Sequence, residues 1–400
     1  MDKVVTRKSE CFGCSACINI CPQKAINFVK DKEGFDYPVI DNKKCVDCGL
    51  CKKVCPSLNK AKNKTDTSVT HYYAAASKKE KVVLNSSSGG IFTELSDAVL
   101  KQQGVVFGAY MDEAFVVRHG CSEDINRHLF VGSKYVQSSL ADIFSKVNMC
   151  LQHNKTVLFS GSPCQIAGLN SFLQQKNTDI SKLYTCDFIC HGASSPLVWQ
   201  HYIELLKKRH GNITKYVFRG KKAGWHEWYP VIKSESEDLS DRYRRKDSYI
   251  LMYQTLFLTR RSCFECPFTC YERVSDITLG DFWNIKNISP DMDDDKGTSE
   301  ILVNTVKGME LFAEIKSDIK YVECTKENVW QPHLEYPNNL PKGRKQFYID
   351  FEKNDMEYIV KKYGKGDMMT RVKNFATPIL KKTGLYVLFG KMYRILIVRK

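Results

Sequence analysis

The spacing of hydrophobic residues divides this chain into segments of different character. The first 60 residues contain no long apolar run, whereas residues 71–210 alternate between two kinds of pattern. Apolar residues spaced three or four apart predict helices, and short runs of β-branched and aromatic residues predict buried strands. Helices are expected over Ile91–Gln103, Leu140–Leu151 and Pro196–Arg209, and strands over Gly104–Tyr110, Thr156–Ser160 and Leu183–Ile189.

This alternation predicts an α/β body, so the fold class is expected to be α+β or α/β. Residues 212–282 show mostly strand and loop patterns, and residues 59–68 form a polar stretch that is typical of a linker. The expected domains are a small N-terminal module over 1–60, a linker over 61–70, a body in two parts over 71–160 and 161–330, and a basic helical tail over 331–400.

Composition and charge narrow the class of protein. At 400 residues with 43% hydrophobic content, the chain is no collagen, mucin or disordered tail. Its net charge of +15 suits an anionic partner, but residues 331–400 alone carry fifteen Lys and Arg against six Asp and Glu. Because this excess sits in a tail with an apolar face, nucleic-acid binding is the disfavoured interpretation, and no nucleic acid is expected as a partner.

The two ends of the chain bear on its location. Met1–Glu10 is charged and has no apolar core, which predicts a cytoplasmic protein. The longest apolar stretch, Leu385–Val398, is interrupted by Lys391 and Arg394, so no membrane span is expected. Gly384–Lys400 has the pattern of a basic amphipathic helix. Such a helix either lies on an anionic membrane, placing the protein at the periphery of the inner membrane face, or packs on the protein core.

Seventeen cysteines, an odd number, argue for metal-bound thiolates rather than a disulfide framework. The spacing Cys-x-x-Cys-x-x-Cys-x-x-x-Cys-Pro occurs twice, from Cys11 and from Cys45. This doubled spacing is that of a ferredoxin with two [4Fe-4S] clusters, in which the fourth cysteine of each run binds the other cluster. Zinc also accepts four cysteines but does not require this pattern. The two expected ligand sets are Cys11, Cys14, Cys17 and Cys55, and Cys45, Cys48, Cys51 and Cys21.

Further cysteines lie where an α/β sheet would bring them together. Cys164 and Cys190 each follow a predicted strand, and Cys263-x-x-Cys266 has a paired-ligand spacing. The alternatives are four inert buried cysteines, or a nucleophilic Cys164 with His191 as its base. The remaining cysteines are expected to be structural: Cys121, Cys150, Cys186, Cys270 and Cys324.

Ser86-Ser-Ser-Gly-Gly90 precedes a predicted helix, where free N–H groups favour a phosphate. A serine cap with flexible glycines explains the same residues. Arg219 and Lys221 lie near two glycines and an aromatic residue, which suits a planar anionic substrate, although a charged hairpin is the simpler interpretation. His191, Arg219 and Lys221 are the expected catalytic residues, and His226 and Asp281 are further candidates on the substrate side.

Six segments, in this order and spacing, resemble the beta subunit family of coenzyme F420 hydrogenases and dehydrogenases over about residues 70–330. They are Ser88–Thr93, Gly132–Tyr135, Pro163–Gln165, Cys190, Cys263–Cys266 and Ser275–Gly280. The resemblance implies a flavoprotein that holds FAD and a third [4Fe-4S] cluster, the latter on Cys164, Cys190, Cys263 and Cys266. It also implies flavin contacts from Ser88, Gly89, Gly90, Thr93, Lys134, Tyr135 and Ser138.

The expected function is that of an iron-sulfur flavoprotein oxidoreductase, since a flavin converts single electrons from clusters into a hydride. The hydride donor or acceptor is expected to be coenzyme F420 or another small organic molecule. His191-Gly192 departs from the residues that typical deazaflavin-reducing members carry there. The expected redox partner is a ferredoxin or another oxidoreductase subunit. The alternative is a non-catalytic electron-transfer subunit that serves a partner enzyme, for example in surface-polysaccharide synthesis.

Overall fold

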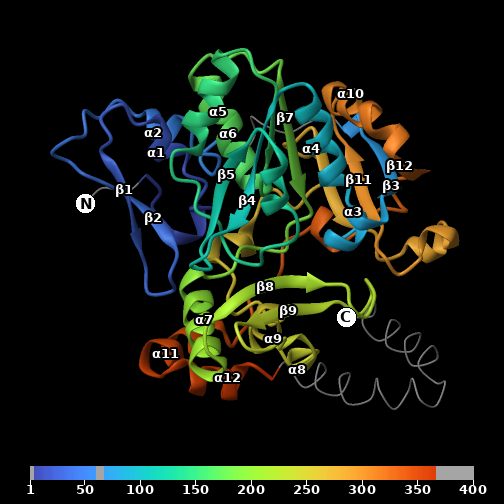
Figure 1. Cartoon of the computed structure of the whole chain (residues 1–400). Helices are drawn as coiled ribbons and strands as arrows, with labels where there is room; N and C mark the ends of the chain where they lie inside the picture. The colour runs from blue at the N-terminus through green and yellow to red at the C-terminus, as the bar shows by residue number, and fades with distance from the viewer. Residues whose placement is uncertain (1–3, 60–66, 366–400) are drawn as a thin grey trace.

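A computed structural model describes residues 4–59 and 67–365, and Figure 1 shows the N-terminal module beside a large central sheet, with a separate lobe below it. The predicted linker over 61–70 falls mostly outside the described residues. The module consists of α1 (Ala16–Ile20), β1 (Ile26–Lys30), β2 (Asp36–Ile40) and α2 (Leu50–Lys53), with β1 and β2 antiparallel. Its own cluster of buried residues is small: Val4, Cys17, Ile26 and Ile40. A core of this size needs additional stabilisation.

The central sheet has eight strands in the order β12-β3-β11-β10-β7-β6-β4-β5. Four adjacent strands, β10, β7, β6 and β4, are parallel, and the other pairings are antiparallel. The strands are β3 (His71–Ser77), β4 (Val105–Met111), β5 (Val117–Ser122), β6 (Val157–Ser160), β7 (Leu183–Phe188), β10 (Ile277–Asp281), β11 (Ser299–Val303) and β12 (Ile319–Cys324). Both predicted parts of the body contribute strands, so they form a single sheet.

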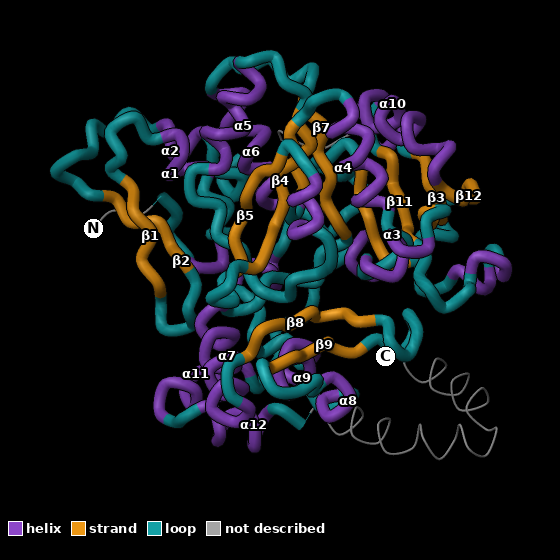
Figure 2. The backbone as a smooth tube through the Cα atoms, in the orientation of Figure 1, coloured by secondary structure: helices purple, strands orange, loops and turns teal. Residues whose placement is uncertain are grey.

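Helices cover both faces of this sheet, as the tube view shows (Figure 2). Successive residues of a strand point to opposite faces. Val106 therefore packs with α4 (Ile91–Lys101) and α10 (Val306–Ile315), while Val105 and Phe107 pack with α5 (Ile143–Gln152) and α6 (Pro163–Gln175). The short helix α3 (Glu80–Asn85) follows β3. The predicted helices and strands of residues 91–189 are confirmed to within a few residues at their ends.

The lower lobe combines the hairpin β8 (Ile213–Gly220) and β9 (Tyr229–Ser234) with five helices. These helices are α7 (Pro196–His210), α8 (Ser240–Tyr243), α9 (Ser248–Gln254), α11 (Arg344–Lys353) and α12 (Met356–Tyr363). The sequence pattern predicts mainly strands and loops here and does not identify α9. Its residues 249–252 are all buried, and a continuous apolar run does not distinguish a helix from a strand.

The first half of the predicted tail is part of this lobe. Phe347, Phe351 and Ile359, from α11 and α12, pack in the same hydrophobic cluster as Trp199 of α7 and Phe218 of β8. The predicted boundary at residue 330 therefore does not separate these helices from the body. The amphipathic helix predicted over Gly384–Lys400 lies outside the described residues. Within the described ranges, no helix is both long and apolar enough to cross a bilayer.

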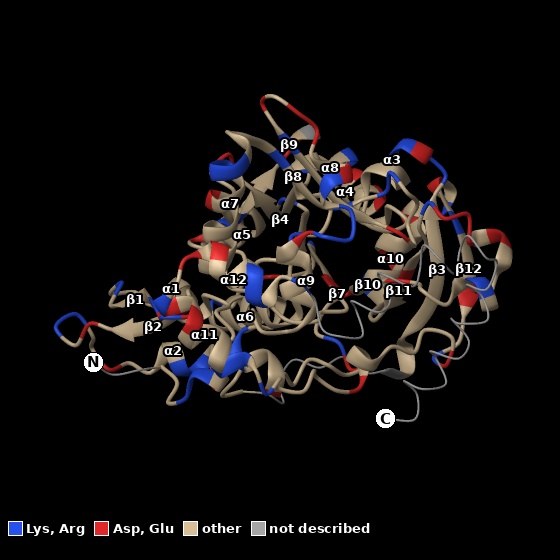
Figure 3. Cartoon of the chain, turned by 90° about the horizontal axis from the view of Figure 1, so that it is seen from below, with Lys and Arg blue, Asp and Glu red and all other residues tan. Residues whose placement is uncertain are grey.

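Acidic and basic residues are interspersed over the described part of the chain (Figure 3). Many Asp and Glu side chains on the surface form ion pairs with Lys or Arg, for example Glu237 with Arg242 and Asp238 with Lys222. The large net positive charge therefore reflects the basic C-terminal residues more than a single basic face of the folded body.

Candidate functional site

The N-terminal cysteines divide into two groups in space. Cys11, Cys14, Cys17 and Cys55 line one cavity, together with Phe12 and Pro56. Burial raises the pKa of Cys17, and the charges of Cys11 and Cys55 raise it further. Burial also raises the pKa of Cys51, and the charges of Cys48 and Cys21 raise it further. The structure thus brings Cys55 to the first motif and Cys21 to the second.

The four cysteines of the predicted inner set come from three separate segments and meet beside the sheet. Cys164 lies in the first turn of α6, Cys190 follows β7, and Cys263 and Cys266 lie in and just after a short 3-10 helix over Arg261–Glu265. Burial raises the pKa of Cys266 strongly, and the charges of Cys164, Cys263 and Cys190 raise it further.

These four half-buried cysteines would repel one another as thiolates, and a positive centre would have to offset their charges. An iron-sulfur cluster supplies one, so these residues fit a cluster. Among the described residues, no three His, Cys, Asp or Glu side chains are spaced to hold a single metal ion.

Backbone N–H groups also point at the sulfurs of the inner set. The Gly192 N–H donates to the Cys190 Sγ and the Ala193 N–H donates to the Cys263 Sγ, each at 3.4 Å. Gly192 has φ of +112°, and a Cβ there would meet the Thr259 methyl at 2.7 Å. Only glycine therefore allows this loop to approach the cysteines. Hydrogen bonds to sulfur are one of the means by which a protein tunes a cluster.

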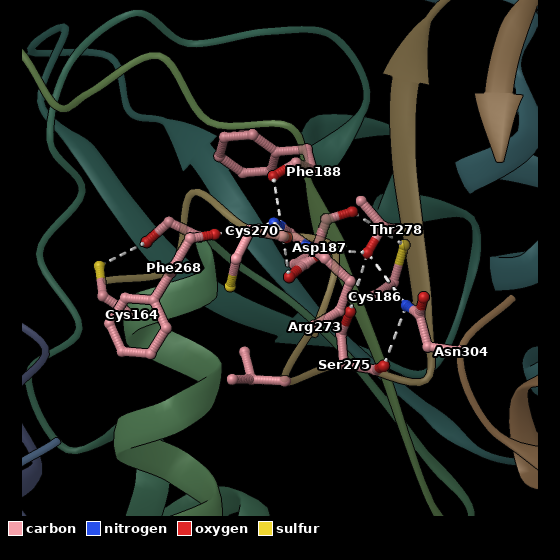
Figure 4. A network of polar contacts seen from close by, with 12 residues as sticks. Cys164, Cys186, Asp187, Phe188, Phe268, Cys270, Arg273, Ser275, Thr278 and Asn304 are labelled. Atoms are coloured by element: carbon pink, nitrogen blue, oxygen red, sulfur yellow. Dashed lines mark hydrogen bonds and ion pairs between the residues drawn. The ribbon is translucent and has the colours of Figure 1, made fainter. Parts of the chain in front are cut away.

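A buried ion pair fixes the loop that carries Cys266 (Figure 4). Arg273 donates to the Asp187 carboxylate at 2.9 Å and to the backbone oxygens of Phe268, Cys270 and Phe188. Both charged side chains are at most 2% exposed. Burial raises the pKa of Asp187 even with Arg273 beside it. Arg273 therefore joins the segment after Cys266 to the end of β7, from which Cys190 emerges.

The two loops predicted to hold the flavin lie side by side. The Ser133 N–H donates to the Ser87 Oγ at 2.8 Å. The Ser88 hydroxyl, however, donates to the Thr298 carbonyl, and the Gly89 N–H donates to the Ser299 hydroxyl. The Ser88 hydroxyl and the Gly89 N–H, both from residues predicted to contact the flavin, thus already form hydrogen bonds within the protein.

The rest of the Ser86–Gly90 loop is held in the same way. A Cβ on Gly89 would meet the Ala75 oxygen at 2.4 Å, so close packing on β3 is sufficient reason for that glycine. Gly90 precedes α4 with φ of +83°, and Thr93 is buried in the first turn of that helix.

Lys221, predicted to be catalytic, holds this loop instead. Its Nζ donates to the carbonyl oxygens of Val83, Ser88 and Lys296. An ammonium group has three protons, and all three are used here. Burial lowers the pKa of Lys221 to about 7. The sequence could not indicate this role because Lys296 lies 75 residues away.

The loop from Lys134 to Ser138 runs from Ser87 toward the inner cysteines. Lys134 donates to the Leu129 and Val131 carbonyls, and burial lowers its pKa to about 7. The Tyr135 ring stacks on Tyr253 with centroids 4.6 Å apart. The Ser138 hydroxyl accepts from Gln165, the residue after Cys164, at 3.0 Å.

Arg219 is a buried arginine with hydrogen-bond donors that lack a partner among the described residues. Its guanidinium carbon lies 5.1 Å from the Trp228 ring centre and 5.3 Å from that of Trp283, and Nη1 forms an ion pair with Asp281. The side chain is 3% exposed, yet Nε and Nη2 have no hydrogen-bond partner among the described residues. Buried donors without partners are costly. This aromatic-flanked arginine fits an anionic group, and Asp281 holds it in place.

The two candidate histidines differ in position. The His191 ring lies against His333, with centroids 4.0 Å apart, near the charges of Asp281 and Arg219. His226 is on the surface, where Nε2 lies 2.6 Å from an Asp293 carboxylate oxygen. The structure therefore brings His191, Arg219 and Asp281 together and leaves His226 at the edge.

A buried carboxyl group that the sequence did not indicate lies beside these residues. Glu300 on β11 is 1% exposed, and it accepts one hydrogen bond from Gln331, which also donates to the Asp281 carbonyl. Burial raises the pKa of Glu300 from 4.5 to about 8. In the sequence Glu300 is one acidic residue in a strand, and nothing local indicates that its side chain is buried against Gln331.

This shift predicts a pH-dependent stability. Glu300 binds its proton more tightly in the folded chain, so its contribution is full below about pH 4.5 and is lost as the pH rises through about 8. The loss is about 1.4 kcal/mol per pH unit. Glu300→Gln should flatten the pH dependence of the thermal midpoint over this range, whereas Glu310→Gln, at an exposed site, should not. Parallel curves for wild type and Glu300→Gln would contradict this expectation.

Two family models match the chain. Residues 154–328 match the C terminus of the coenzyme F420 hydrogenase/dehydrogenase beta subunit, and residues 10–59 match the 4Fe-4S dicluster domain. A polyferredoxin-like protein of Methanocaldococcus jannaschii is 41% identical over an alignment of 58 residues, and the match covers 12% of this chain. The chain spans 32% of the length of that relative. A protein of Porphyra purpurea is 34% identical over 68 residues, covering 16% of this chain and 88% of its own length.

A solved structure, from the F420-reducing [NiFe] hydrogenase complex of Methanosarcina barkeri, has a TM-score of 0.42 and 16% identity, and the match covers 75% of this chain and 92% of that one. The two family models cover the segment that supplies all four inner cysteines and the segment with the doubled cysteine motif. Residues 154–328 of this chain therefore match the C-terminal part of the coenzyme F420 hydrogenase/dehydrogenase beta subunit family, and a 4Fe-4S dicluster domain precedes them over residues 10–59.

Proposed function

We propose that this protein is an FAD- and iron-sulfur-dependent oxidoreductase that transfers a hydride to or from coenzyme F420 or another small organic molecule. Bound [4Fe-4S] clusters would supply one-electron transfer, and bound FAD would convert it to two-electron chemistry. The twelve cysteines of the three sets would hold the clusters. The proposal places the protein in the cytoplasm, with a ferredoxin or another oxidoreductase subunit as its redox partner.

The observation that carries the proposal is the series of contacts that links the aromatic-flanked Arg219, through Tyr135 and Tyr253, to the inner cysteines. Tyr253, which stacks on Tyr135, lies close enough to Cys190 and Cys263 for their charges to raise its pKa beyond the effect of burial. Tyr135 in turn lies beside Arg219, whose charge acts on it. A binding site for a planar anionic group thus adjoins the thiolates that would hold the inner cluster.

Within this site, each side chain has a role that follows from its contacts. Arg219 offers two free N–H donors to an anionic group, and Asp281 fixes the guanidinium between the tryptophans. Tyr135 and Trp228 cover one side with apolar rings and exclude water there. Lys134, next to Ser133, holds its own loop through hydrogen bonds to the Leu129 and Val131 carbonyls. His191 stands at the exposed edge, where it is positioned to exchange a proton with solvent.

Anaerobic isolation of the full chain, with iron, sulfide and flavin counted, tests the proposal. We expect about twelve irons for three [4Fe-4S] clusters, and about one FAD. The flavin should then be reduced by reduced coenzyme F420 or oxidised by the deazaflavin. A preparation that holds iron but no flavin would overturn the hydride step and leave the alternative, an electron-transfer subunit for a partner enzyme. A preparation with zinc in place of iron would overturn the whole proposal.

A further inference from the structure

Arg260 forms hydrogen bonds with the segments that carry two of the cysteine sets. Its backbone belongs to the inner set: its N–H donates to the Ala193 carbonyl at 2.8 Å, and its carbonyl accepts from the Cys263 N–H at 3.0 Å. Its side chain reaches the N-terminal module, where Nε donates to the Cys11 carbonyl at 2.8 Å and Nη2 donates to the Cys11 Sγ at 3.4 Å. The residue is 1% exposed.

The other contacts of Arg260 hold the module against the body. Nη2 also donates to the Asp36 carbonyl on β2, and Nη1 donates to the Gln137 side-chain oxygen, while Gln137 donates in turn to the Phe12 carbonyl. The guanidinium carbon lies 4.4 Å from the ring centre of Tyr37. A Cβ on Gly13 would meet this guanidinium at 3.1 Å, so the first cysteine motif packs directly on it.

The acceptors of Arg260 leave its charge uncompensated by carboxylates. They are two backbone carbonyls, an amide oxygen and a sulfur, and none of these four carries a carboxylate charge. Burial would lower the pKa of Arg260, but the charge of Cys11, then those of Tyr37 and Cys263, raise it above its ordinary value. A guanidinium stays protonated in proteins, and a buried charge requires a counter-charge. As cluster ligands, Cys11 and Cys263 would be thiolates and would supply that counter-charge from both cysteine sets.

We infer that Arg260 is a positioning residue that clamps the N-terminal cysteine module onto the inner cysteine set and makes the cluster held by Cys11 easier to reduce. The inference rests on the proposed function, because it requires clusters on both sets. A positive charge and an N–H bond to a ligand sulfur favour the more negative, reduced state, and burial limits screening by salt. The packing of Cys14 against Gly168 of α6 brings the same cluster toward Cys164.

The test is a redox titration of the full chain, prepared anaerobically and followed by electron paramagnetic resonance. In Arg260→Met, one N-terminal cluster signal should require a lower potential, with about tenfold less reduced cluster at a fixed potential, which equals about 59 mV for one electron. Arg260→Lys keeps the charge and should recover part of this shift. The matched control is Arg344→Met, because Arg344 is also buried and joins Glu33 of the module to the Thr259 carbonyl, but its hydrogen bonds go to no sulfur.

The outcomes separate this inference from the proposed function. Wild-type protein without iron would overturn the proposed function, and no titration would follow. Iron-replete Arg260→Met with wild-type potentials would overturn the role of Arg260 alone, and so would an equal shift of the same signal in Arg344→Met. If Arg260→Met fails to retain iron, Arg260→Lys decides: a signal shifted to lower potential supports the inference, and wild-type potentials overturn it.

Discussion

Replacing Cys164 with serine is expected to lower the iron content from about twelve to about eight atoms per chain. Cys164 is placed with Cys190, Cys263 and Cys266 by three separate segments, so the loss of one ligand should remove the inner cluster and leave the N-terminal module intact. Reduced N-terminal clusters should then form without reducing a bound flavin, because the inner cluster is the missing connection.

The matched control for this change is Cys121→Ser, since Cys121 is an exposed cysteine on β5 outside all three sets. Iron and sulfide counts on anaerobic preparations, together with electron paramagnetic resonance spectra, provide the measurement. An unchanged iron content in Cys164→Ser would contradict the assignment of this residue as a ligand. A loss of four irons in the control would show that the change reports instability rather than ligand loss.

The second large effect is expected at Arg273, whose replacement by methionine should destabilise the fold by about 3–5 kcal/mol. The change leaves Asp187, which is 1% exposed, without its ion-pair partner (Figure 4). It also removes the hydrogen bonds that Arg273 donates to the backbone oxygens of Phe268, Cys270 and Phe188. One oxygen of Asp187 already lacks a hydrogen bond, and the Thr278 and Ser275 hydroxyls that also favour its charged form are neutral, so they do not replace the charge of the lost arginine. The inner cluster should be lost at a lower temperature than in wild type.

Arg242→Met provides the comparison for Arg273→Met. Arg242 pairs with Glu237 at the surface, where such pairs contribute about 0–1 kcal/mol. Anaerobic thermal unfolding, with absorbance of the clusters as a second signal, measures both variants. The double variant Arg273→Met with Asp187→Asn should recover part of the loss, because it removes the uncompensated charge. Equal stabilities for Arg273→Met and Arg242→Met would show that the buried pair is not needed.

Much of the fold followed from local patterns. The helices and strands of residues 91–189 alternate with clear periodicity, and the structure confirms them. The packing of the C-terminal region could not be predicted in this way, because nothing in the pattern of α11 and α12 indicates that α12 packs on α7 and α9. Phe347 and Ile359 are fully buried, and the cluster that buries them includes Trp199 and Phe218, which lie more than 100 positions earlier. Periodicity describes one face of an element and does not identify the partner that covers it.

The sequence by itself determined the chemistry of the N-terminal module, because eight cysteines at a fixed local spacing leave few alternatives to paired clusters. It also pointed to Cys164, Cys190, Cys263 and Cys266, but only tertiary structure brings these residues from different segments to one place. Tertiary structure likewise decided the roles of isolated charges. Lys221 holds a loop, Glu300 stays buried, and Arg260 spans two cysteine sets. The role of a charged side chain depends on its burial and its partners, and both are fixed by segments far away in the chain.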